Sequence, residues 1–255
     1  MAIKKNKFLV WKKITFSIIS LSIVFAVIWS AFWWSDFQNT LTIQKVIFSD
    51  TAVLDKKNYE LCLGNIIGIH PDKISLNAIS NLIEEHPYVK AARVSNHYPG
   101  VIKIEIMERK PIALLQASPM IMLDGEGVVL PDLNNFADFN LPTLSNFNSD
   151  PDLYPLGKKA LSVKVKESIV WLARLQKDYE SLYNNLSEMK MTSVNEMELI
   201  LADEPTQIFL GNDDVWSRIE ILQNFEKRLT PKKISDYSYL DMRYKNQIIV
   251  KGRRS

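Results

Sequence analysis

The sequence predicts an α+β protein in which a single N-terminal transmembrane helix is followed by two exported domains. Three observations support this class: an uncharged apolar stretch of membrane-spanning length, a β-α-α-β-β order of hydrophobic patterns after it, and a later series of short strands interrupted by two helices. The second domain is expected to be a mixed α/β domain with a meandering, antiparallel-rich sheet. A length of 255 residues suits one or two domains.

Positive charge is concentrated at the N-terminus. The 31 basic and 29 acidic residues give a formal net charge of +2, but the first thirteen residues hold five lysines and no acid. Without these five, the chain from residue 35 onward carries a net charge of −3, which lacks the clustered positive face that nucleic acid requires. We therefore expect no nucleic-acid partner. The five lysines are Lys4, Lys5, Lys7, Lys12 and Lys13.

Residues 14–34 are predicted to form the membrane anchor. As a helix these 21 residues would span about 30 Å, which is the thickness of a hydrocarbon core. The lysines precede the span, so residues 1–13 are expected to be a cytoplasmic tip and the body to be exported. The expected bilayer contacts, with tryptophans at the far interface, are Ile14, Phe25, Trp29, Trp33 and Trp34.

Two other interpretations of this span are a cleaved signal peptide and a buried core helix. A signal peptide ends in small residues at its cleavage site, whereas this span ends in the bulky sequence AFWW at 31–34. A core helix of a soluble domain would show a polar stripe, which this span lacks. The sequence therefore favours an uncleaved single-pass anchor, with a linker over 35–42.

The first exported domain is predicted from strand and helix periodicities that alternate with turn signals. Gly64 and His86-Pro87 end the two helices, and Ile102, Ile104 and Ile106 alternate with polar residues as in a strand that covers a core. Two helices on one face of a small sheet make a two-layer domain. The expected elements are a strand over 43–48, a helix over 55–63, a helix capped by Ser75, and strands over 89–95 and 101–108.

This region contains a series of short motifs, in the order HPYVK at 86–90, RV at 93–94, YPG at 98–100, IKI at 102–104 and ERKPIA at 108–113. Each motif alone is weak, but their order and spacing behind an N-terminal anchor are specific. Together they resemble the POTRA domain of the FtsQ/DivIB family of bacterial cell-division proteins. The resemblance implies a POTRA domain over residues 43–112.

The second exported domain, over residues 113–255, is predicted to hold short strands and two helices. Residues 133–156 are rich in Asn, Asp and Pro, which indicates a long surface loop. The first helix is expected to begin at Ser162 and to bury one face, and the second to begin at Asp213 or Asp214 and to end at Pro231. The first buried face comprises Val165, Ile169, Leu172, Gln176, Tyr179 and Tyr183. Strands are expected over 112–116, 120–123, 128–130, 188–193, 196–201, 206–210, 237–244 and 247–251.

The C-terminal segment YLDMRY at 239–244 is similar to the C-terminal signature of the same family. The resemblance then covers nearly the whole chain. A glycine that is common in the last turn of the family is Gln247 here, and the chain ends four residues after Lys251. The short tip and the short tail are more similar to the FtsQ branch than to the longer-tailed DivIB branch.

No catalytic motif is visible in the sequence. The three histidines lack metal-binding spacing, and Cys62, the one cysteine, is more typical of a small buried residue than of a nucleophile. Asp124 and Glu126 lie in an Asp-Gly turn, which is a hairpin signal without the spacing of a calcium loop. We therefore expect no catalytic, cofactor-binding or metal-binding site, although acid–base pairs from distant parts of a chain are invisible in sequence.

The resemblance implies that the last strand is a sheet edge that binds the FtsB-like subunit of a complex with an FtsL-like protein. On the matching positions, Arg243 and Tyr244 are the expected contacts, and the docking edge comprises Lys245, Asn246, Gln247, Ile248, Ile249 and Val250. Two alternatives stay open at this stage. Tyr244 shares the parity of Leu240 and Met242 and so suits a core position, and Arg243 suits an ion pair with Asp241.

The function implied by the resemblance is that of a non-enzymatic divisome scaffold at the septum. Such a protein would sit in the inner membrane with its N-terminus in the cytoplasm, and other division proteins would contact the POTRA domain, whose Ile47–Phe48 strand is a weaker candidate edge, or the anchor. Two alternatives remain. One is a POTRA-type binding module of an export or envelope-assembly system, and the other is a membrane-tethered periplasmic enzyme.

Overall fold

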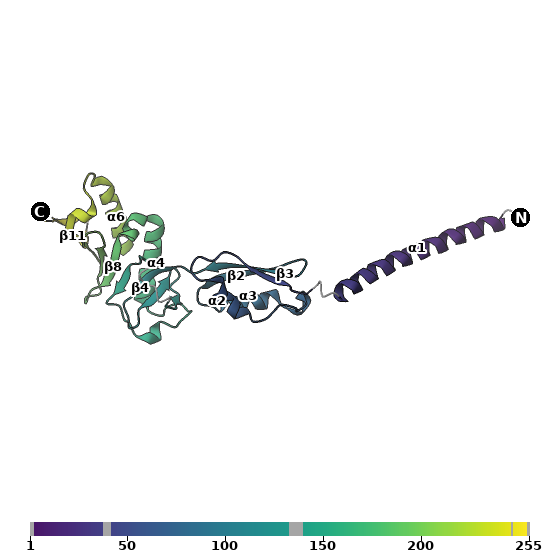
Figure 1. Ribbon diagram of the computed structural model, residues 1–255. Helices are drawn as coiled ribbons and strands as arrows, with labels where there is room; N and C mark the ends of the chain where they lie inside the picture. The colour runs from purple at the N-terminus through teal and green to yellow at the C-terminus, as the bar shows by residue number, and fades with distance from the viewer. Residues whose placement is uncertain (1–2, 38–41, 133–139, 246, 254–255) are drawn as a thin grey trace. The chain divides into compact units, whose positions relative to one another are not determined.

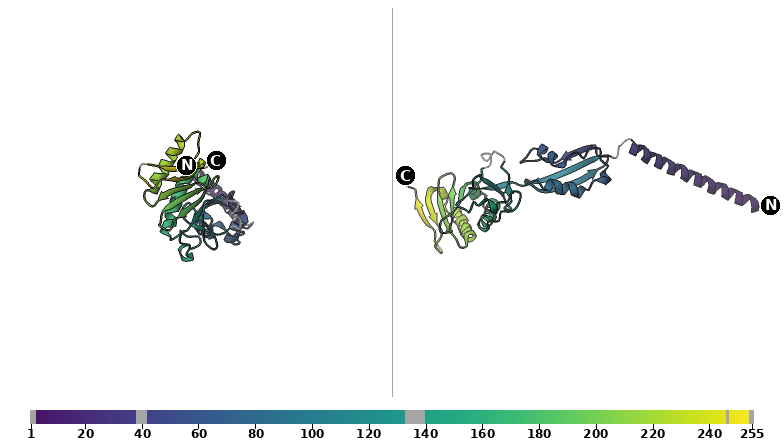
Figure 2. Two further views of the ribbon diagram at one scale, coloured as in Figure 1. Left: turned by 90° about the vertical axis from the view of Figure 1, so that its left-hand side faces the viewer. Right: turned by 90° about the horizontal axis from the view of Figure 1, so that it is seen from below.

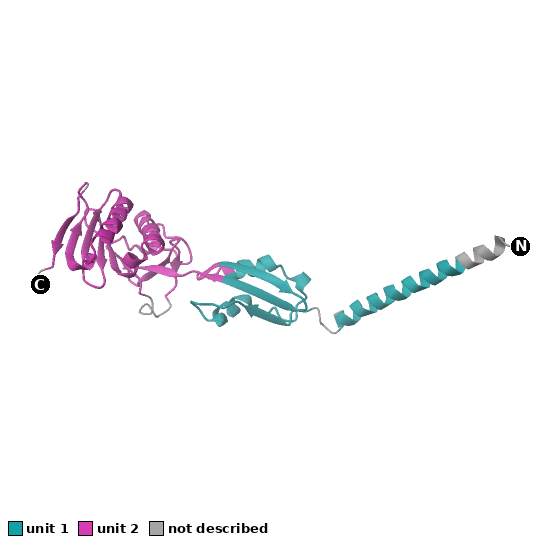
Figure 3. Cartoon of the chain, turned by 90° about the horizontal axis from the view of Figure 1, so that it is seen from above, with its two compact units in different colours: residues 1–83, 91–106 teal, residues 84–90, 107–255 magenta. Residues whose placement is uncertain are grey.

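The computed structural model describes residues 3–37, 42–132, 140–245 and 247–253, and for residues 3–10 and Asp36 it describes the backbone alone (Figure 1). The chain divides into two compact units, which Figure 3 shows in different colours. The first unit comprises Met1–Ile83 and Ala91–Ile106, and the second comprises Glu84–Lys90 and Met107–Ser255. The structure is α+β, as predicted from the sequence.

The predicted anchor is one continuous helix, α1 (Ile3–Phe37). Its stretch Trp11–Ser35 is long and apolar enough to cross a membrane, and none of it is buried against the rest of the protein. The five side chains expected to contact the bilayer, Ile14, Phe25, Trp29, Trp33 and Trp34, are all exposed. Lys12 and Lys13 are exposed near the start of this stretch, and Lys4, Lys5 and Lys7 lie in the turns before it.

The rest of the first unit is a three-stranded sheet with two helices. Its elements are β1 (Lys45–Phe48), α2 (Lys56–Leu63), α3 (Leu76–Glu84), β2 (Val89–His97) and β3 (Val101–Glu108), and the strand order is β1-β3-β2. β1 runs parallel to β3, and both helices cover one face of the sheet (Figure 1). The alternation predicted for β3 is confirmed, because Ile102 and Ile104 are fully buried. Ser75 caps α3 through its hydroxyl, which accepts a hydrogen bond from the N–H of Ala78 at 3.3 Å.

The second unit is built on a nine-stranded mixed sheet with the order β12-β11-β10-β9-β8-β7-β4-β5-β6. Five of the neighbouring pairs are antiparallel and three are parallel, so the sheet is antiparallel-rich. The strands are β4 (Pro111–Leu115), β5 (Ile121–Asp124), β6 (Val129–Leu130), β7 (Thr143–Ser145), β8 (Leu186–Met191), β9 (Met197–Leu201), β10 (Gln207–Gly211), β11 (Tyr237–Asp241) and β12 (Ile249–Gly252).

Three helices accompany this sheet: α4 (Val163–Asp178), α5 (Glu180–Asn184) and α6 (Val215–Arg228). The second unit's buried apolar side chains from the helices and the strands form one continuous core. α4 and α6 are neighbours (Figure 2). The guanidinium of Arg174 in α4 stacks 3.9 Å above the ring of Trp216 in α6. One face of the sheet is therefore covered by helices.

Two expectations about the second unit are wrong. The segment 133–156 is not only a surface loop, because β7 lies within it between β4 and β8, and Leu144 is fully buried there. Gln176 is exposed and Leu175 is buried instead, because the buried face of α4 runs through Ser168, Leu172 and Leu175. β7 was not predicted because a strand of three residues is too short to show a recognisable alternation in sequence.

The helix caps give one confirmation and one correction. Ser162 caps α4 as expected, accepting a hydrogen bond from the N–H of Val165 at 3.4 Å. Asp214 occupies the N-cap position of α6 but makes no capping hydrogen bond with its side chain. Its backbone is left-handed (φ 49°), so its carboxylate does not take the usual capping geometry.

Candidate partner-binding edge

β12 is the outermost strand at one end of the nine-stranded sheet. It pairs with β11 on one side only, and all four of its residues are exposed. Among the described residues, no backbone hydrogen bond reaches its outer side. Two of its side chains, Ile249 and Val250, are large, apolar and about 40% exposed. An edge with unpaired backbone groups and exposed apolar side chains is a template for another strand.

The outermost strand at the other end of the sheet, β6, is covered. Residues 156–160 run along it and form bridges to Val128 and Val129. The N–H of Gly157 donates to Val129 O at 2.9 Å, and the N–H of Val129 donates to Lys158 O at the same distance. We call residues 156–160 the strap. Its hydrogen bonds occupy the backbone groups of Val129 that a strand from another protein would need.

The backbone hydrogen bonds of the last strand show which of its groups face outward. Lys251 O accepts a hydrogen bond from the hydroxyl of Ser238 in β11, and the N–H of Arg253 donates to Asp236 O. Residues 251 and 253 therefore face β11. Because successive residues of a strand direct their backbone groups to opposite sides, those of Val250 and Gly252 face away from the sheet. These are the groups available to a partner strand.

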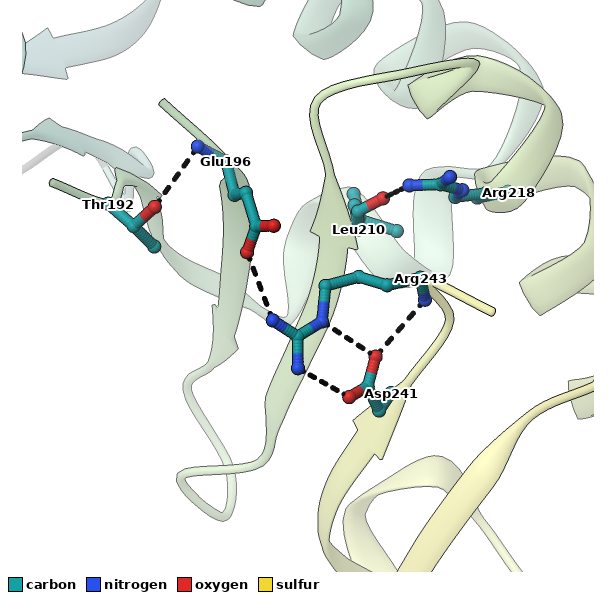
Figure 4. A network of polar contacts seen from close by, with 6 residues as sticks. All are labelled: Thr192, Glu196, Leu210, Arg218, Asp241 and Arg243. Atoms are coloured by element: carbon teal, nitrogen blue, oxygen red, sulfur yellow. Dashed lines mark hydrogen bonds and ion pairs between the residues drawn. The ribbon is translucent and has the colours of Figure 1, made fainter. Parts of the chain in front are cut away.

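Arg243 lies just after β11 and is held by two carboxylates (Figure 4). Its Nη2 donates to Asp241 Oδ2 at 2.6 Å, its Nε donates to Asp241 Oδ1 at 2.9 Å, and its Nη1 donates to Glu196 Oε2 at 3.0 Å. The hydrogen bonds from Arg243 hold the pKa of Asp241 below its ordinary value, and the two carboxylates raise the pKa of Arg243. The guanidinium also lies 5.3 Å from the ring centre of Phe209.

This network decides one alternative left open by the sequence. The ion pair between Arg243 and Asp241 is present, and its position ties the end of β11 to the start of β9 through Glu196. Arg243 is thus a structural residue of the edge. Its side chain is still 39% exposed, so it is also accessible to a partner.

Tyr244 is not a core residue, although it has the parity of Leu240 and Met242. Leu240 and Met242 are buried, but β11 ends at Asp241, and the ring of Tyr244 is 52% exposed. Lys245 and Gln247 are also exposed, Ile248 is partly buried, and Asn246 lies outside the described residues. The structure therefore brings Tyr244 and the exposed side chains of β12 to the same end of the sheet.

A groove of about 680 Å³ lies beside this edge. It is bounded by the start of α6 and by the segment that connects β11 to β12. Ile221, Met242, Tyr244 and Ile248 form its apolar part, and Asp213 and Asp214 are the acidic residues among those that line it. Val250 stands opposite Leu240 in the pairing of β12 with β11, so both side chains point to the face covered by helices. Side chains of an added strand on that face would lie near this groove.

Arg253 fixes the far end of β12. Its Nε donates to Ser235 O at 3.0 Å, its Nη2 donates to Thr206 Oγ1 at 3.1 Å, and its Nη1 lies 3.6 Å from Glu204 Oε2. Thr206 is fully buried and donates in turn to Tyr237 O. Arg243 and Arg253 thus hold the two ends of the β11–β12 hairpin to the rest of the sheet.

The sequence did not reveal these contacts of Glu196, Arg253 and Ile221. Glu196 and Arg243 are 47 residues apart, as are Arg253 and Thr206. Ile221 gave a weak signal, since a large apolar residue on the polar side of the α6 pattern suggests an uncovered contact surface. Pairs at such separations have no local pattern, so only the sheet order brings them together.

The acidic turn at 124–127 is a hairpin with an internal ion-pair cluster. Asp124 Oδ1 accepts hydrogen bonds from the N–H groups of Glu126 and Val128, and Asp124 Oδ2 accepts one from Arg109 at 2.7 Å. Glu126 pairs with both Arg109 and Lys90. Hydrogen bonds from Lys90 and Arg109 lower the pKa of Glu126 to about 2. Within the described ranges, no group of three or more His, Cys, Asp or Glu side chains is arranged to hold a metal ion.

Cys62 differs slightly from its expected role. It is partly buried on α2 rather than fully buried, and its Sγ lies 3.5 Å from Asn58 O. Burial raises the pKa of its thiol, which is the opposite of what an activated nucleophile requires.

Comparison with known proteins places these elements in a family. Residues 110–251 match the family described as "FtsQ/DivIB, C-terminal related". The chain is 26% identical over 180 residues to a "Cell division protein FtsQ" from Geotalea daltonii, covering 70% of this chain and 64% of that relative. Relatives of the same name from Syntrophotalea carbinolica and Neisseria gonorrhoeae are 24% and 22% identical, over 70% and 81% of this chain and 62% and 75% of their own lengths. The matches thus span slightly less than two thirds of the first two relatives.

Proposed function

Because the chain belongs to the FtsQ/DivIB family of cell-division proteins, we propose that it is a non-enzymatic, single-pass scaffold that captures an FtsB-like subunit on β12. An FtsL-like protein would join through that subunit. The protein would link early and late division proteins at the septum, with its N-terminus in the cytoplasm and both exported units in the periplasm. The five lysines before the anchor support this orientation.

One observation supports the capture site above all others: β12 is an uncovered edge in a sheet whose opposite edge carries a strap. A protein that left edges open indiscriminately would risk aggregation through both. Here β12 is pinned by Arg253 at one end, and the segment leading to it by Arg243 at the other. The edge is therefore ordered before a partner arrives, which reduces the entropic cost of binding.

The proposed binding mode is strand addition. The partner segment would pair with the outward backbone groups of Val250 and Gly252, and these bonds would supply affinity without regard to side chains. Specificity would come from alternate side chains of the partner. Those on the helix-covered face would meet the groove beside Ile221, Tyr244 and Ile248.

Arg243 and Tyr244 have different roles in this proposal. Arg243 holds the start of the hairpin through Asp241 and Glu196, and its remaining exposed surface is open to an acidic partner residue. Tyr244 is exposed and has no role in the core, which suits a residue that becomes buried only in a complex. Loss of Tyr244 should therefore weaken capture without unfolding the protein.

A weaker contact site for another division protein is β1. This strand also stands at the edge of its sheet, and its residue Ile47 is 40% exposed. It has four residues and an adjacent groove of about 330 Å³, half the volume beside β12. The anchor helix offers a further surface for partners within the membrane.

The proposed capture site is tested by substitution of one outward-facing amide. Val250→Pro removes the N–H that a partner strand would use, while edge strands tolerate proline where the N–H faces outward. We expect the full-length variant to lose at least tenfold in affinity for a co-expressed FtsB-like subunit. The matched control is Val250→Ala, which keeps the N–H and should lose much less.

The two variants separate the parts of the proposal. If the full-length wild-type protein does not capture the FtsB-like subunit, the partner assignment is wrong. If it does, and Val250→Pro captures the subunit as well as Val250→Ala does, strand addition on β12 is wrong. Circular dichroism of both variants confirms that the fold is retained.

A further inference from the structure

Three segments build the end of the first unit that follows the anchor in sequence. We call this end the entry end. The N–H of Ile43 donates to Ile69 O at 2.9 Å, and the N–H of Gly68 donates to Ile43 O at 2.8 Å. The N–H of Gln44 donates to Gly100 O at 2.7 Å. The entry segment at 42–44 thus holds the loop at 65–69 on one side and the β2–β3 turn at 98–100 on the other.

The turn packs directly on the entry segment. Gly100 has a positive φ of 66°, and a Cβ atom there would lie 2.4 Å from Thr42 O. Only glycine permits this approach. The β2–β3 turn is therefore fixed beside the residue at which the described chain resumes after the anchor.

Each of the two flanking segments exposes one large side chain. Tyr98 is 78% exposed in the turn, and Ile67 is 58% exposed in the loop. Neither supports the core of the unit, whose centre at this end is the buried Ile43. Both side chains are therefore available for a contact outside the unit.

The covalent chain keeps this end close to the bilayer. Thr42 follows Phe37, the last residue of α1, by five positions along the chain, so their Cα atoms are at most about 18 Å apart. The headgroup region of a bilayer has a depth of several ångströms on each side of the hydrocarbon core. The entry end is thus within reach of the membrane surface, whatever path the connecting residues take.

We propose that Tyr98 and Ile67 rest in the interfacial layer of the bilayer and hold the first unit against the membrane. Tyrosine is enriched at this depth because its ring is apolar and its hydroxyl can contact headgroups and water. Ile67 adds apolar surface beside it. Lys45, whose N–H also donates to Gly100 O, is exposed near the turn and can approach lipid phosphates.

A weak contact with lipid is sufficient to orient the first unit, because the anchor of the same chain already holds the unit at the membrane. The anchor confines the entry end to the membrane surface, which gives an effective concentration far above that of a free domain. Two side chains would not recruit a soluble protein to a bilayer, but they can orient a domain that is already tethered. This proposal is independent of β12, and substitutions at Tyr98 and Ile67 should leave capture of the FtsB-like subunit unchanged.

The experiment measures contact of this end with lipid in the full-length protein. The native thiol is removed by Cys62→Ser, and an environment-sensitive fluorophore is attached at Asn96→Cys, an exposed position two residues before Tyr98. The protein is reconstituted in vesicles of phosphatidylethanolamine and phosphatidylglycerol with a nitroxide on the headgroup in both leaflets. The control label is at Ala91→Cys, an exposed position about 17 Å further along β2.

We expect quenching at residue 96 to be at least threefold stronger than at residue 91. Adding Tyr98→Ser and Ile67→Ser should reduce quenching at residue 96 to the level at residue 91, although the tether is unchanged. Equal quenching at the two labels in the otherwise native protein would overturn the proposal. So would strong quenching at residue 96 that survives the double substitution, because it would come from the tether alone.

Discussion

The two outer strands of the large sheet are treated in opposite ways. β6 has two residues, both buried, and the strap covers it, whereas β12 has four residues, all exposed, and is uncovered. Both strands belong to the same sheet, so the difference does not come from the fold class. The strap leaves β12 as the open outer strand of this sheet, which is why we propose β12 as the docking edge.

Each end of the sheet also carries one arginine between two carboxylates, and the two clusters differ in burial. Arg109, near β6, is 16% exposed and its partner Asp124 is 5% exposed. Arg243, near β12, is 39% exposed and its partner Asp241 is 10% exposed. The pair of Arg109 and Asp124 is thus the more buried of the two, while Arg243 is accessible at the proposed interface. Equivalent substitutions should therefore have unequal effects on stability.

The largest expected effect is that of Asp124→Ala. It leaves the guanidinium of Arg109 partly buried without its closest partner and leaves two N–H groups, of Glu126 and Val128, without an acceptor. We expect the free energy of unfolding to fall by about 3 kcal/mol. The matched variant Asp241→Ala should cost about 1 kcal/mol, since Arg243 keeps Glu196 and more solvent. Urea denaturation of both variants measures the difference, and equal losses would contradict it.

Proline substitutions test the alternation of the backbone along β12. Lys251→Pro removes an N–H that faces β11 and should cost about 2 kcal/mol of stability. Val250→Pro removes an N–H that faces away and should cost less than about 1 kcal/mol. Hydrogen exchange of the wild-type protein gives an independent measurement, in which the amide of Lys251 should exchange more slowly than that of Val250. The reverse order would show that the outward groups are assigned to the wrong residues.

The strap can be weakened at Gly157. This residue has a φ of 71°, and a side chain there would contact Pro87 at 3.4 Å, so Gly157→Val should cost about 1 kcal/mol through backbone strain. If the strap then separates from β6, the exposed edge should promote self-association. Analytical ultracentrifugation at several concentrations checks this, and Gly252→Val, at a glycine with open space around it, is the control. A variant that stays monomeric while losing stability would limit the strap to a packing role.

The smallest effect concerns acid. The pKa of Glu126 is lowered to about 2 from an ordinary value of 4.5, so its ion pairs add stability that is fully present above about pH 4.5 and is lost as the pH falls toward 2. Glu126→Gln should therefore be less stable than the wild type by less than about 1 kcal/mol at pH 7, and equally stable near pH 2. Thermal unfolding at pH 7, 4 and 2.5 follows this difference. A difference that grows on acidification would have the wrong sign.

Local patterns predicted most of the fold. The alternation of Ile102 and Ile104, the Ser75 and Ser162 caps and the anchor all depend on neighbouring residues, and the structure confirms them. β7 was missed because its three residues are determined by their neighbours β4 and β8 rather than by their own pattern. Burial of Tyr244 could not be settled either, because parity applies only while a strand continues, and β11 ends three residues earlier.

The candidate site was predictable as a segment but not as a surface. The position of β12 at the edge was implied by the family resemblance. The contact of Arg243 with Glu196 and the pin at Arg253 depend on side chains that meet across 47 residues of sequence. Such pairs are set by strand order, which single-sequence patterns do not contain.

The connection between β10 and β11 has a consequence for the outer edge of the sheet. These strands are parallel, so α6 crosses over between them, whereas β11 and β12 form a local hairpin. The hairpin therefore joins the sheet through β10 alone, with further support from the hydrogen bonds of Arg243 and Arg253. Loss of the β10–β11 pairing would release β11 and β12 together. The order of the outer edge thus depends on a contact that lies one strand further into the sheet.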